Sequence, residues 1–252
     1  MNPSGANEHF SRTALLTGTE GLERLKNASV ALAGVGGVGS YAAEALARAG
    51  VGNITVIDSD VIHRSNINRQ LHALTNTVGR PKVEVMAERI SLINPDINLT
   101  PLHMTISPEN IEPLLAVRFD IVLDAIDTLD AKLALLVACH KDAQPVISSM
   151  GAAGRIDPSR VKVADISESK GCRLARKLRK LLRGKGIERG IKVVYSDEPF
   201  DINSIGPRDD SFDSRRSLGS ISYMPAIFGM TLAGVAIRIL LDNETKKIRY
   251  SS

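Results

Sequence analysis

The chain contains 252 residues, of which 43% are hydrophobic and 24% charged, and it carries a formal net charge of +4. This composition is typical of a soluble globular protein, and the first residues show no basic region followed by an apolar run, so we expect no signal peptide. The two cysteines, Cys139 and Cys172, form no CxxC pair. Their spacing argues against a disulfide framework or a cysteine-rich zinc site and favours a reducing cytoplasm.

The positive charge is concentrated in one stretch of the sequence. Residues 170–192 hold ten lysines or arginines and one acid, so this segment has a net charge of +9 and the rest of the chain −5. Basic residues gathered in one patch are typical of a protein that binds a polyanion at one place.

The first 150 residues alternate between helix and strand patterns. Residues 1–27 are expected to form an N-terminal arm and helix, and residues 28–56 read as strand, glycine turn, helix and strand, which requires a parallel sheet. Further helices are expected at 80–95, 107–116 and 129–142, and strands at 97–104, 120–127 and 145–150. The predicted fold is therefore α/β, a doubly wound, Rossmann-like, mainly parallel sheet, with an ATP-binding domain over residues 28–155.

Residues 156–252 are expected to form a small C-terminal basic lobe. Strands are predicted on either side of the basic stretch, and the segment from Asp201 to Leu218 lacks apolar periodicity and is expected to be a mobile loop that closes over the site. The apolar run from Ile221 to Leu241 is long enough to span a bilayer. It contains Pro225, two glycines and Arg238 and lacks an aromatic belt, so we expect a buried core or dimer-interface helix instead.

A glycine-rich turn follows the first predicted strand. Gly34, Gly36 and Gly39 satisfy GxGxxG, with Gly37 inside the motif, and Asp58 stands 19 residues later at the end of the next strand. The helix after the turn offers free amides to phosphates, and the acid is placed to accept from both ribose hydroxyls. This motif alone indicates only a nucleotide with an unmodified ribose; a glycine turn without a ligand is the simpler alternative.

Polar and basic residues crowd the loop after Asp58. Asp60, Asn66, Arg69 and Gln70 lie in it, and Lys82 stands in the first turn of the following helix. Hydride transfer does not need cations aimed at the phosphates, whereas attack on an α-phosphate does, because charge develops on the transferred group and on the departing pyrophosphate. The alternative is that Arg69 and Lys82 are solvated surface charges.

Two acids follow the buried strand predicted at 120–127. Asp124 and Asp127 stand at its carboxyl end, the edge where ligands bind in open α/β sheets. A carboxylate beside a triphosphate is a natural Mg²⁺ ligand. We expect Asp127 in that role and Asp124 as the residue more suited to capping the following helix.

Several of these motifs occur together, in order: "GVGGVGS", "IDSD", "NINRQ", "GRPKVE", "INP" and "DAIDT". In this the sequence resembles the adenylating enzymes related to ubiquitin-activating enzymes and to the bacterial sulfur-carrier activators. Those enzymes attach AMP from ATP to a carboxylate and work as dimers. The resemblance implies that Asp58 holds the ribose, that Asn66, Arg69 and Gln70 line the phosphate path, that Lys82 contacts the phosphates and that Asp127 binds Mg²⁺. It also implies that Arg12, in "FSRTALLTG", reaches the partner subunit's ATP site as an arginine finger.

The chain departs from the sulfur-carrier activators, because it lacks their two CxxC pairs and offers only Cys172 in the region of their reactive cysteine. Its second half, with "ISSMGAAGRIDPSRVKVADIS", "VVYSDEP" and "GSISYMPAIFGMTLAG", resembles the tRNA threonylcarbamoyladenosine dehydratases. In that family ATP adenylates the carboxylate of a modified adenosine beside the anticodon, and a nitrogen of the same side chain closes a ring. Because the nucleophile belongs to the substrate, no protein thiol is required.

The basic stretch fits such a substrate. Leu174, Leu178, Leu181 and Leu182 recur at helical spacing, which leaves a broad basic outer face for tRNA phosphates. That face is predicted to consist of Arg173, Arg176, Lys177, Arg179, Lys180 and Arg183. The alternative is an ordinary solvated amphipathic helix. Cys172 has a lesser alternative role as a reactive thiol among these cations, and Cys139 is expected to be buried in a helix.

The predicted function is thus ATP-dependent adenylation and dehydrative cyclisation of threonylcarbamoyladenosine in tRNA. We expect the enzyme to be a cytoplasmic homodimer that uses Mg²⁺ and does not enter a membrane. The resemblance leaves room for a structural monovalent cation and a sulfur-transfer accessory protein. The nearest alternative is an adenylyltransferase for the C-terminus of a small sulfur-carrier or ubiquitin-like protein. A nicotinamide-dependent oxidoreductase and a non-catalytic tRNA-binding or sulfur-transfer adaptor are the alternatives from other classes.

Overall fold

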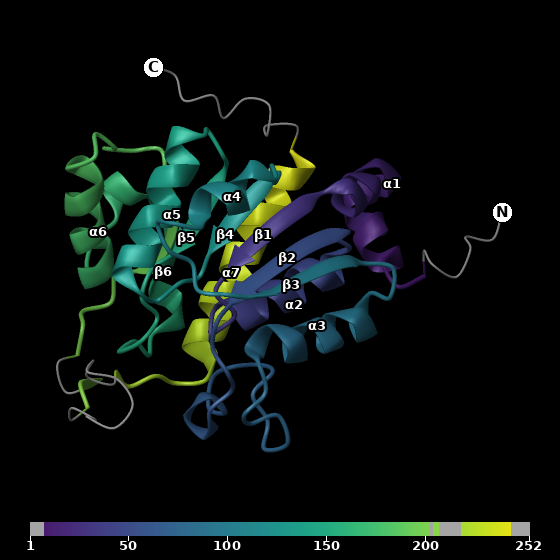
Figure 1. Cartoon of the computed structure of the whole chain (residues 1–252), viewed down its shortest axis with the longest axis horizontal. Coiled ribbons are helices and arrows are strands. Elements are labelled where there is room, and N and C mark those ends of the chain that lie inside the picture. Colours follow the sequence, from purple (N-terminus) through teal and green to yellow (C-terminus); the bar gives the residue numbers. More distant parts are fainter. Residues whose placement is uncertain (1–7, 202–203, 207–217, 243–252) are drawn as a thin grey trace.

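One seven-stranded sheet organises the molecule, in the order β3-β2-β1-β4-β5-β7-β6 (Figure 1). The computed structural model describes residues 8–201, 204–206 and 218–242. Neighbouring strands are parallel except β6, which pairs antiparallel with β7 at the edge. The strands are β1 (Ser29–Ala33), β2 (Asn53–Asp58), β3 (Asn98–His103), β4 (Ile121–Asp124), β5 (Val146–Ser149), β6 (Val161–Asp165) and β7 (Lys192–Ser196).

Helices cover both faces of the sheet. The helices are α1 (Ser11–Asn27), α2 (Gly39–Ala49), α3 (Lys82–Ile93), α4 (Ile111–Ala116), α5 (Leu129–Lys141), α6 (Arg173–Arg183) and α7 (Tyr223–Leu241), with short 3-10 turns η2 (Arg64–Asn66), η3 (Pro158–Arg160) and η4 (Ile166–Glu168). One apolar core lies between the sheet and α2, α3 and α7, and a second between the sheet and α4, α5 and α6. The predicted doubly wound α/β fold is confirmed.

The strand order explains why β1, β4 and β5 are buried along almost their whole length. They lie inside a parallel sheet with helices on both faces, and every residue of β4 and β5 is buried. The chain leaves β1 toward one side of the sheet and β4 toward the other, so the carboxyl ends of these two strands border a crevice, the position where open α/β sheets bind ligands.

The segment expected to form a C-terminal lobe extends the same sheet. β7 pairs with β5, and β6 forms the edge beyond it, while α7 returns to the core beside α2. Division of the chain into residues 1–27, 28–155 and 156–252 stays a prediction. Most of the loop expected from Asp201 to Leu218 lies outside the described residues.

Among the described helices, α7 is the one that is long and apolar enough to span a membrane. Met224, Phe228, Leu232 and Ala236 from this helix are nevertheless buried in the core shared with α2 and the sheet. The prediction of a core helix is therefore confirmed.

Gly229 sets the distance between α7 and α2. A Cβ atom at this position would lie 2.3 Å from the carbonyl oxygen of Val38 and 2.9 Å from Cβ of Tyr41. Gly234, one turn further along α7, has no atom within 4 Å of the corresponding position. The first glycine is thus required for packing and the second is not.

We expect Gly229→Ala and Gly234→Ala to change stability in opposite directions. Gly229→Ala should lower the free energy of unfolding by about 1–3 kcal/mol, because the added methyl group overpacks the contact with α2. Gly234→Ala should raise it by up to about 1 kcal/mol, because alanine favours helix more than glycine does. Urea unfolding of both variants measures this; equal effects would contradict the packing role of Gly229.

Candidate nucleotide-binding site

The glycine turn joins β1 to α2 at the crevice. A Cβ at Gly34, whose φ is +90°, would lie 2.7 Å from the carbonyl oxygen of Ala125, and a Cβ at Gly39 would lie 1.8 Å from the carbonyl oxygen of Gly34. Backbone packing therefore requires glycine at both positions. Gly36 is different, since the nearest atom to its Cβ position is Nε2 of Gln70 at 3.8 Å. Its exposed backbone side is where a phosphate can approach.

Helix α2 begins directly after this turn. No side chain caps its first amides. Its amides and the positive end of its dipole point into the crevice and favour an anion there. At Gly37 the turn is packed against α7, because a Cβ at this position would lie 3.0 Å from Cβ of Pro225.

Asp58 ends β2 and is bound to the glycine turn. One carboxylate oxygen accepts the amide of Val35 at 2.7 Å, and the other accepts the amide of Asp60 at 2.8 Å. These bonds fix the carboxylate beside the crevice, and each oxygen keeps a second lone pair for a ribose hydroxyl.

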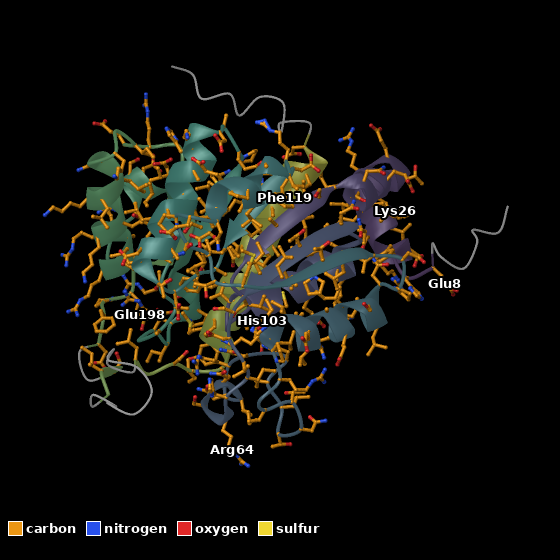
Figure 2. All side chains as sticks on the ribbon, viewed as in Figure 1. Glu8, Lys26, Arg64, His103, Phe119 and Glu198 are labelled. Atoms are coloured by element: carbon orange, nitrogen blue, oxygen red, sulfur yellow. The ribbon has the colours of Figure 1, made fainter. Side chains whose placement is uncertain are left out.

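The loop after β2 brings Asn66, Arg69 and Gln70 to the same edge of the sheet. Figure 2 shows this loop projecting beyond the sheet, with Arg64 labelled on it, on the side where His103 and Glu198 also follow their strands. Oδ1 of Asn66 accepts the amide of His63, and the carbonyl of Asn66 accepts the amides of Arg69 and Gln70. Asn66 therefore shapes the loop from a buried position.

Gln70 lies closer to the turn. Its side chain is buried, and its Oε1 has no hydrogen-bond partner among the residues that the structure describes. A buried amide oxygen without a partner is rare in folded proteins and indicates a site that a ligand or water completes.

Arg69 and Asp127 interact electrostatically at the crevice. Burial lowers the pKa of Arg69, and the negative charge of Asp127 partly offsets this effect, so the two side chains share one electrostatic environment. Nη1 of Arg69 donates to the carbonyl oxygen of Ser65 at 2.8 Å. Asp127 is exposed, which leaves its oxygens open to a hard cation.

Lys82 is bound to Asp60. Its Nζ donates to Oδ2 of Asp60 at 2.6 Å, and its backbone amide donates to the carbonyl oxygen of Asp60. The lysine side chain is 6% exposed and the aspartate side chain 63% exposed. The ammonium group is thus held at the edge of the crevice by an acid that solvent and ligands can reach.

The structure corrects the expectation for Asp124. Helix α5 has Thr128 at its N-cap, whereas Asp124 is fully buried and accepts from Nζ of Lys132 at 2.7 Å. Ser148 donates to the same carboxylate, and Lys132 also donates to the carbonyl of Ser149 at 2.9 Å. Asp124 is therefore part of a buried ion pair that joins β4, β5 and α5. It does not cap the next helix.

His72 is a buried residue of this region that sequence patterns did not identify. Neither ring nitrogen has a hydrogen-bond partner within the described part of the chain. Burial, and then the charges of Lys82 and Arg89, lower the pKa of His72 to about 4. The ring is therefore neutral at physiological pH and lies close to the predicted phosphate-binding lysine. What distinguishes His72 is its burial, and this burial becomes visible only in the folded structure.

Arg12 lies away from this crevice within its own chain. It is exposed in the first turn of α1, and α1 leads through Ala28 into the amino end of β1, while the glycine turn follows the carboxyl end. In Figure 1 α1 lies on the far right of the molecule and α6 on the far left. The structure therefore does not bring Arg12 together with the residues of the crevice in its own chain.

The basic face predicted on α6 is largely present. Arg173, Arg176, Lys177, Lys180 and Arg183 are exposed. Arg179 is the exception, because its Nη1 donates to the carbonyls of Ile166 and Ser169 at 3.1 and 2.7 Å and holds η4 against the helix. Leu181 is also 38% exposed and does not join the apolar face. Arg179 is thus bound to neighbouring backbone and does not extend freely into solvent.

The two cysteines are both buried. Sγ of Cys172 accepts the amide of Ala175 at 3.5 Å and caps α6. Cys139 lies inside α5, as predicted, and burial raises its pKa to about 12, with Asp124 and Asp142 adding to the effect. Neither environment is that of an accessible thiolate.

The fold and this crevice define a Rossmann-like nucleotide-binding protein in which cations and carboxylates border the crevice. The chain belongs to the ThiF family, whose model matches residues 10–251. It is 43% identical to the tRNA threonylcarbamoyladenosine dehydratase of Bacillus subtilis over 95% of this chain and 98% of that protein. The crystal structure of the Escherichia coli tRNA N6-threonylcarbamoyladenosine dehydratase in complex with ATP matches with a TM-score of 0.87 at 34% identity, over 98% of this chain and 100% of that chain.

The carrier-protein activators are more distant. The Escherichia coli molybdopterin-synthase adenylyltransferase is 37% identical over 150 residues, which is 59% of this chain and 59% of that protein. The predicted family resemblance, including its extension over the second half of the chain, is confirmed.

The lowered pKa of His72 predicts a specific loss of stability in acid. The folded state binds fewer protons at this position than the unfolded state between pH 6.5 and 4, so stability is present above pH 6.5 and falls as pH is lowered. Between pH 7 and pH 5 the wild-type chain should lose about 2 kcal/mol more unfolding free energy than His72→Leu. Chemical unfolding at both pH values measures this difference. The surface control His103→Leu should follow the wild type; parallel curves for all three proteins would contradict the prediction.

Proposed function

We propose that this chain is an ATP-dependent tRNA threonylcarbamoyladenosine dehydratase. The observation that carries this proposal is the likeness to such enzymes along the whole chain, including the strands and basic helix of its second half. The Escherichia coli molybdopterin-synthase adenylyltransferase, by contrast, matches over only 59% of this chain. The basic surface of α6 is what a tRNA substrate requires and a small protein substrate does not.

In the first step a carboxylate oxygen of the substrate attacks the α-phosphorus of ATP. The bond to the β-phosphate oxygen breaks, and pyrophosphate leaves with its electron pair. In this proposal Asp58 accepts from the ribose, the amides around Gly36 bind phosphate oxygens, and Arg69 and Lys82 take up the charge that develops on the phosphates. Nε2 of Gln70, the atom nearest to the Cβ position of Gly36, can donate to a phosphate oxygen, whereas the unpartnered Oε1 can only accept from a hydroxyl or amino group of the ligand.

In the second step the side-chain nitrogen of the substrate attacks the activated acyl carbon. AMP leaves with the oxygen of the former carboxylate, the nitrogen loses its proton, and the ring has lost the elements of water. The nucleophile is already part of the substrate, so the chain has only to hold the acyl phosphate and exclude solvent. The burial of Cys172 is consistent with a reaction that needs no enzyme thiol.

The exposed carboxylate of Asp127 fits Mg²⁺, which prefers oxygen ligands and is bound by few protein groups together with substrate phosphates. When bound, the ion would neutralise phosphate charge during adenylation. Asp124 does not fit this role, because Lys132 and Ser148 already donate to its Oδ2 and the amide of Ile126 donates to its Oδ1.

The proposal includes a cytoplasmic homodimer that does not enter a membrane and that binds tRNA through the exposed cations of α6. A structural monovalent cation and a sulfur-transfer accessory protein stay predictions. The burial of α7 supports its assignment to the protein core. The position of Arg12 supports a site completed by a second subunit.

The first test is ATP turnover with defined tRNA. Purified protein, ATP and Mg²⁺ are incubated with tRNA that carries threonylcarbamoyladenosine or with tRNA from cells unable to make it. We expect pyrophosphate release and loss of one water from the nucleoside mass only with the modified tRNA. Release with a carrier protein instead would favour the adenylyltransferase. Nucleotide binding without release would favour an adaptor or an oxidoreductase.

The dimer is tested by complementation. Arg12→Ala and Lys82→Ala should each abolish turnover, whereas their co-expression should restore about one quarter of wild-type activity, because half of the dimers then contain one intact shared site. Pyrophosphate release from the co-purified dimers with ATP, Mg²⁺ and modified tRNA is the measurement. No recovery would show that both residues act within one subunit, and an active Arg12→Ala variant would show that Arg12 has no role.

A further inference from the structure

Arg155 is a buried cation that pairs with no acid among the described residues. It is 4% exposed, yet its Nε and Nη1 have no hydrogen-bond partner among the described residues. A guanidinium group is permanently charged, and burying it without an acceptor destabilises a protein. Such groups persist where a ligand supplies the acceptor. The contrast with Lys132, whose ammonium group has three partners, is direct.

An aromatic ring holds this guanidinium in place. Cζ of Arg155 lies 5.6 Å from the centroid of the Phe200 ring, and Cζ of Arg173 lies 4.4 Å from the same centroid. Gly154 makes the approach of the ring feasible, because a Cβ there would lie 2.7 Å from Cε2 of Phe200. Two cations from different segments thus meet on one ring.

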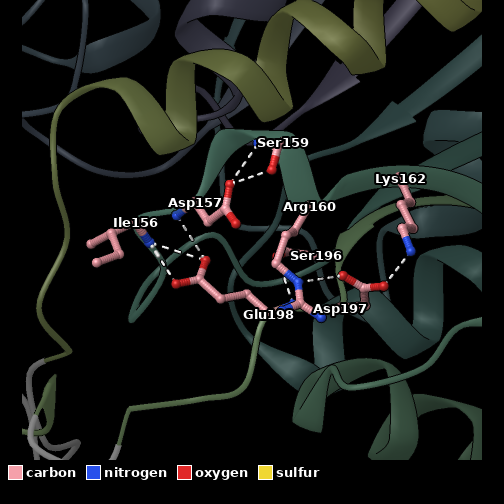
Figure 3. Close-up of polar contacts among 8 residues, drawn as sticks. All are labelled: Ile156, Asp157, Ser159, Arg160, Lys162, Ser196, Asp197 and Glu198. Carbon is pink, nitrogen blue, oxygen red and sulfur yellow. Dashed lines mark hydrogen bonds and ion pairs between the residues drawn. The ribbon is translucent and has the colours of Figure 1, made fainter.

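Figure 3 shows how the two segments are fastened together. The carboxylate of Glu198 accepts the amides of Ile156 and Asp157 at 3.0 to 3.1 Å. Asp197 pairs with Arg160 and with Lys162. The Glu198 bonds lie next to Arg155 on one segment and two residues before Phe200 on the other, so polar contacts join the two segments close to the cations and the ring.

The first turn of α7 connects Arg155 to the nucleotide crevice. Tyr223 donates to the carbonyl oxygen of Ile156 at 2.8 Å, and Pro225 packs on the glycine turn at Gly37. On its other side Arg155 is continuous with α6 through Phe200 and Arg173. The cluster therefore lies between the predicted tRNA-binding face and the predicted ATP site.

We propose that Arg155 is a positioning residue that binds a backbone phosphate of the tRNA substrate close to the modified adenosine. The proposal rests on the proposed function and extends it from α6 to the crevice. A phosphate is favoured over the side-chain carboxylate of the nucleoside because Arg155 continues the row of cations that begins on α6. Phe200 keeps the guanidinium oriented before RNA arrives.

The test compares Arg155→Met with Arg155→Lys and with Arg118→Met, which removes an exposed charge between α4 and β4. Direct binding is measured with modified and with unmodified tRNA, and KM and kcat with modified tRNA. Arg155→Met should weaken binding of both tRNAs about tenfold or more and raise KM with little change in kcat, since a hydrogen bond to a charged group is lost. Arg155→Lys should recover part of the affinity, and Arg118→Met should match the wild type.

Thermal unfolding gives a readout that separates positioning from packing. Removal of an unpaired buried charge should leave the unfolding midpoint of Arg155→Met unchanged or raise it by about 2–4 °C. A lower midpoint with unchanged tRNA affinity would show a packing role and overturn the proposal. Weakened binding of modified tRNA alone would place the nucleoside carboxylate at Arg155 and overturn the phosphate assignment. If the wild type releases no pyrophosphate, the proposed function fails, and the binding of tRNA still decides the role of Arg155.

Discussion

Two backbone segments meet at the carboxyl ends of β1 and β4 without room for a side chain between them, and the nucleotide crevice is built on this contact. Gly34 approaches the carbonyl of Ala125, and Gly39 approaches Gly34 itself. A ligand in the crevice therefore meets backbone amides and the uncapped start of α2. Because the turn is rigid, its Val35 amide can hold Asp58, and the acid and the amides stay in register.

Helix α7 contacts both halves of the chain. Its first turn contacts the glycine turn through Pro225 and the segment after β5 through Tyr223, and Gly229 lets it lie directly on α2. The nucleotide crevice and the segment after β5 are thus positioned by the same helix. Helix α6 packs on α5 and η4, so the one sheet holds it in a fixed relation to the glycine turn, as the proposed transfer of AMP to tRNA requires.

Local spacing was sufficient to predict the fold and much of the crevice. The glycine motif, Asp58 and the loop that follows depend on neighbours in sequence, and their placement in strands and turns follows from short-range rules. The burial of polar side chains does not follow from such short-range rules. Lys132, His72 and Arg155 acquire their character from segments far away in the chain. Arg179 has the helical spacing of an outer-face residue, yet its long side chain folds back onto the carbonyls of η4, a contact that spacing alone does not predict.

Three of the buried basic side chains illustrate different answers to one physical problem. Lys132 keeps its charge because Asp124, Ser148 and Ser149 satisfy it, so it serves the sheet and binds nothing else. His72 is neutral at physiological pH, because burial lowers its pKa. Arg155 keeps its charge, and the described residues around it offer a ring and no acceptor. A satisfied buried cation stabilises the fold, whereas an unsatisfied one retains free energy that an incoming anion releases on binding. That difference is the physical reason to look for the substrate at Arg155.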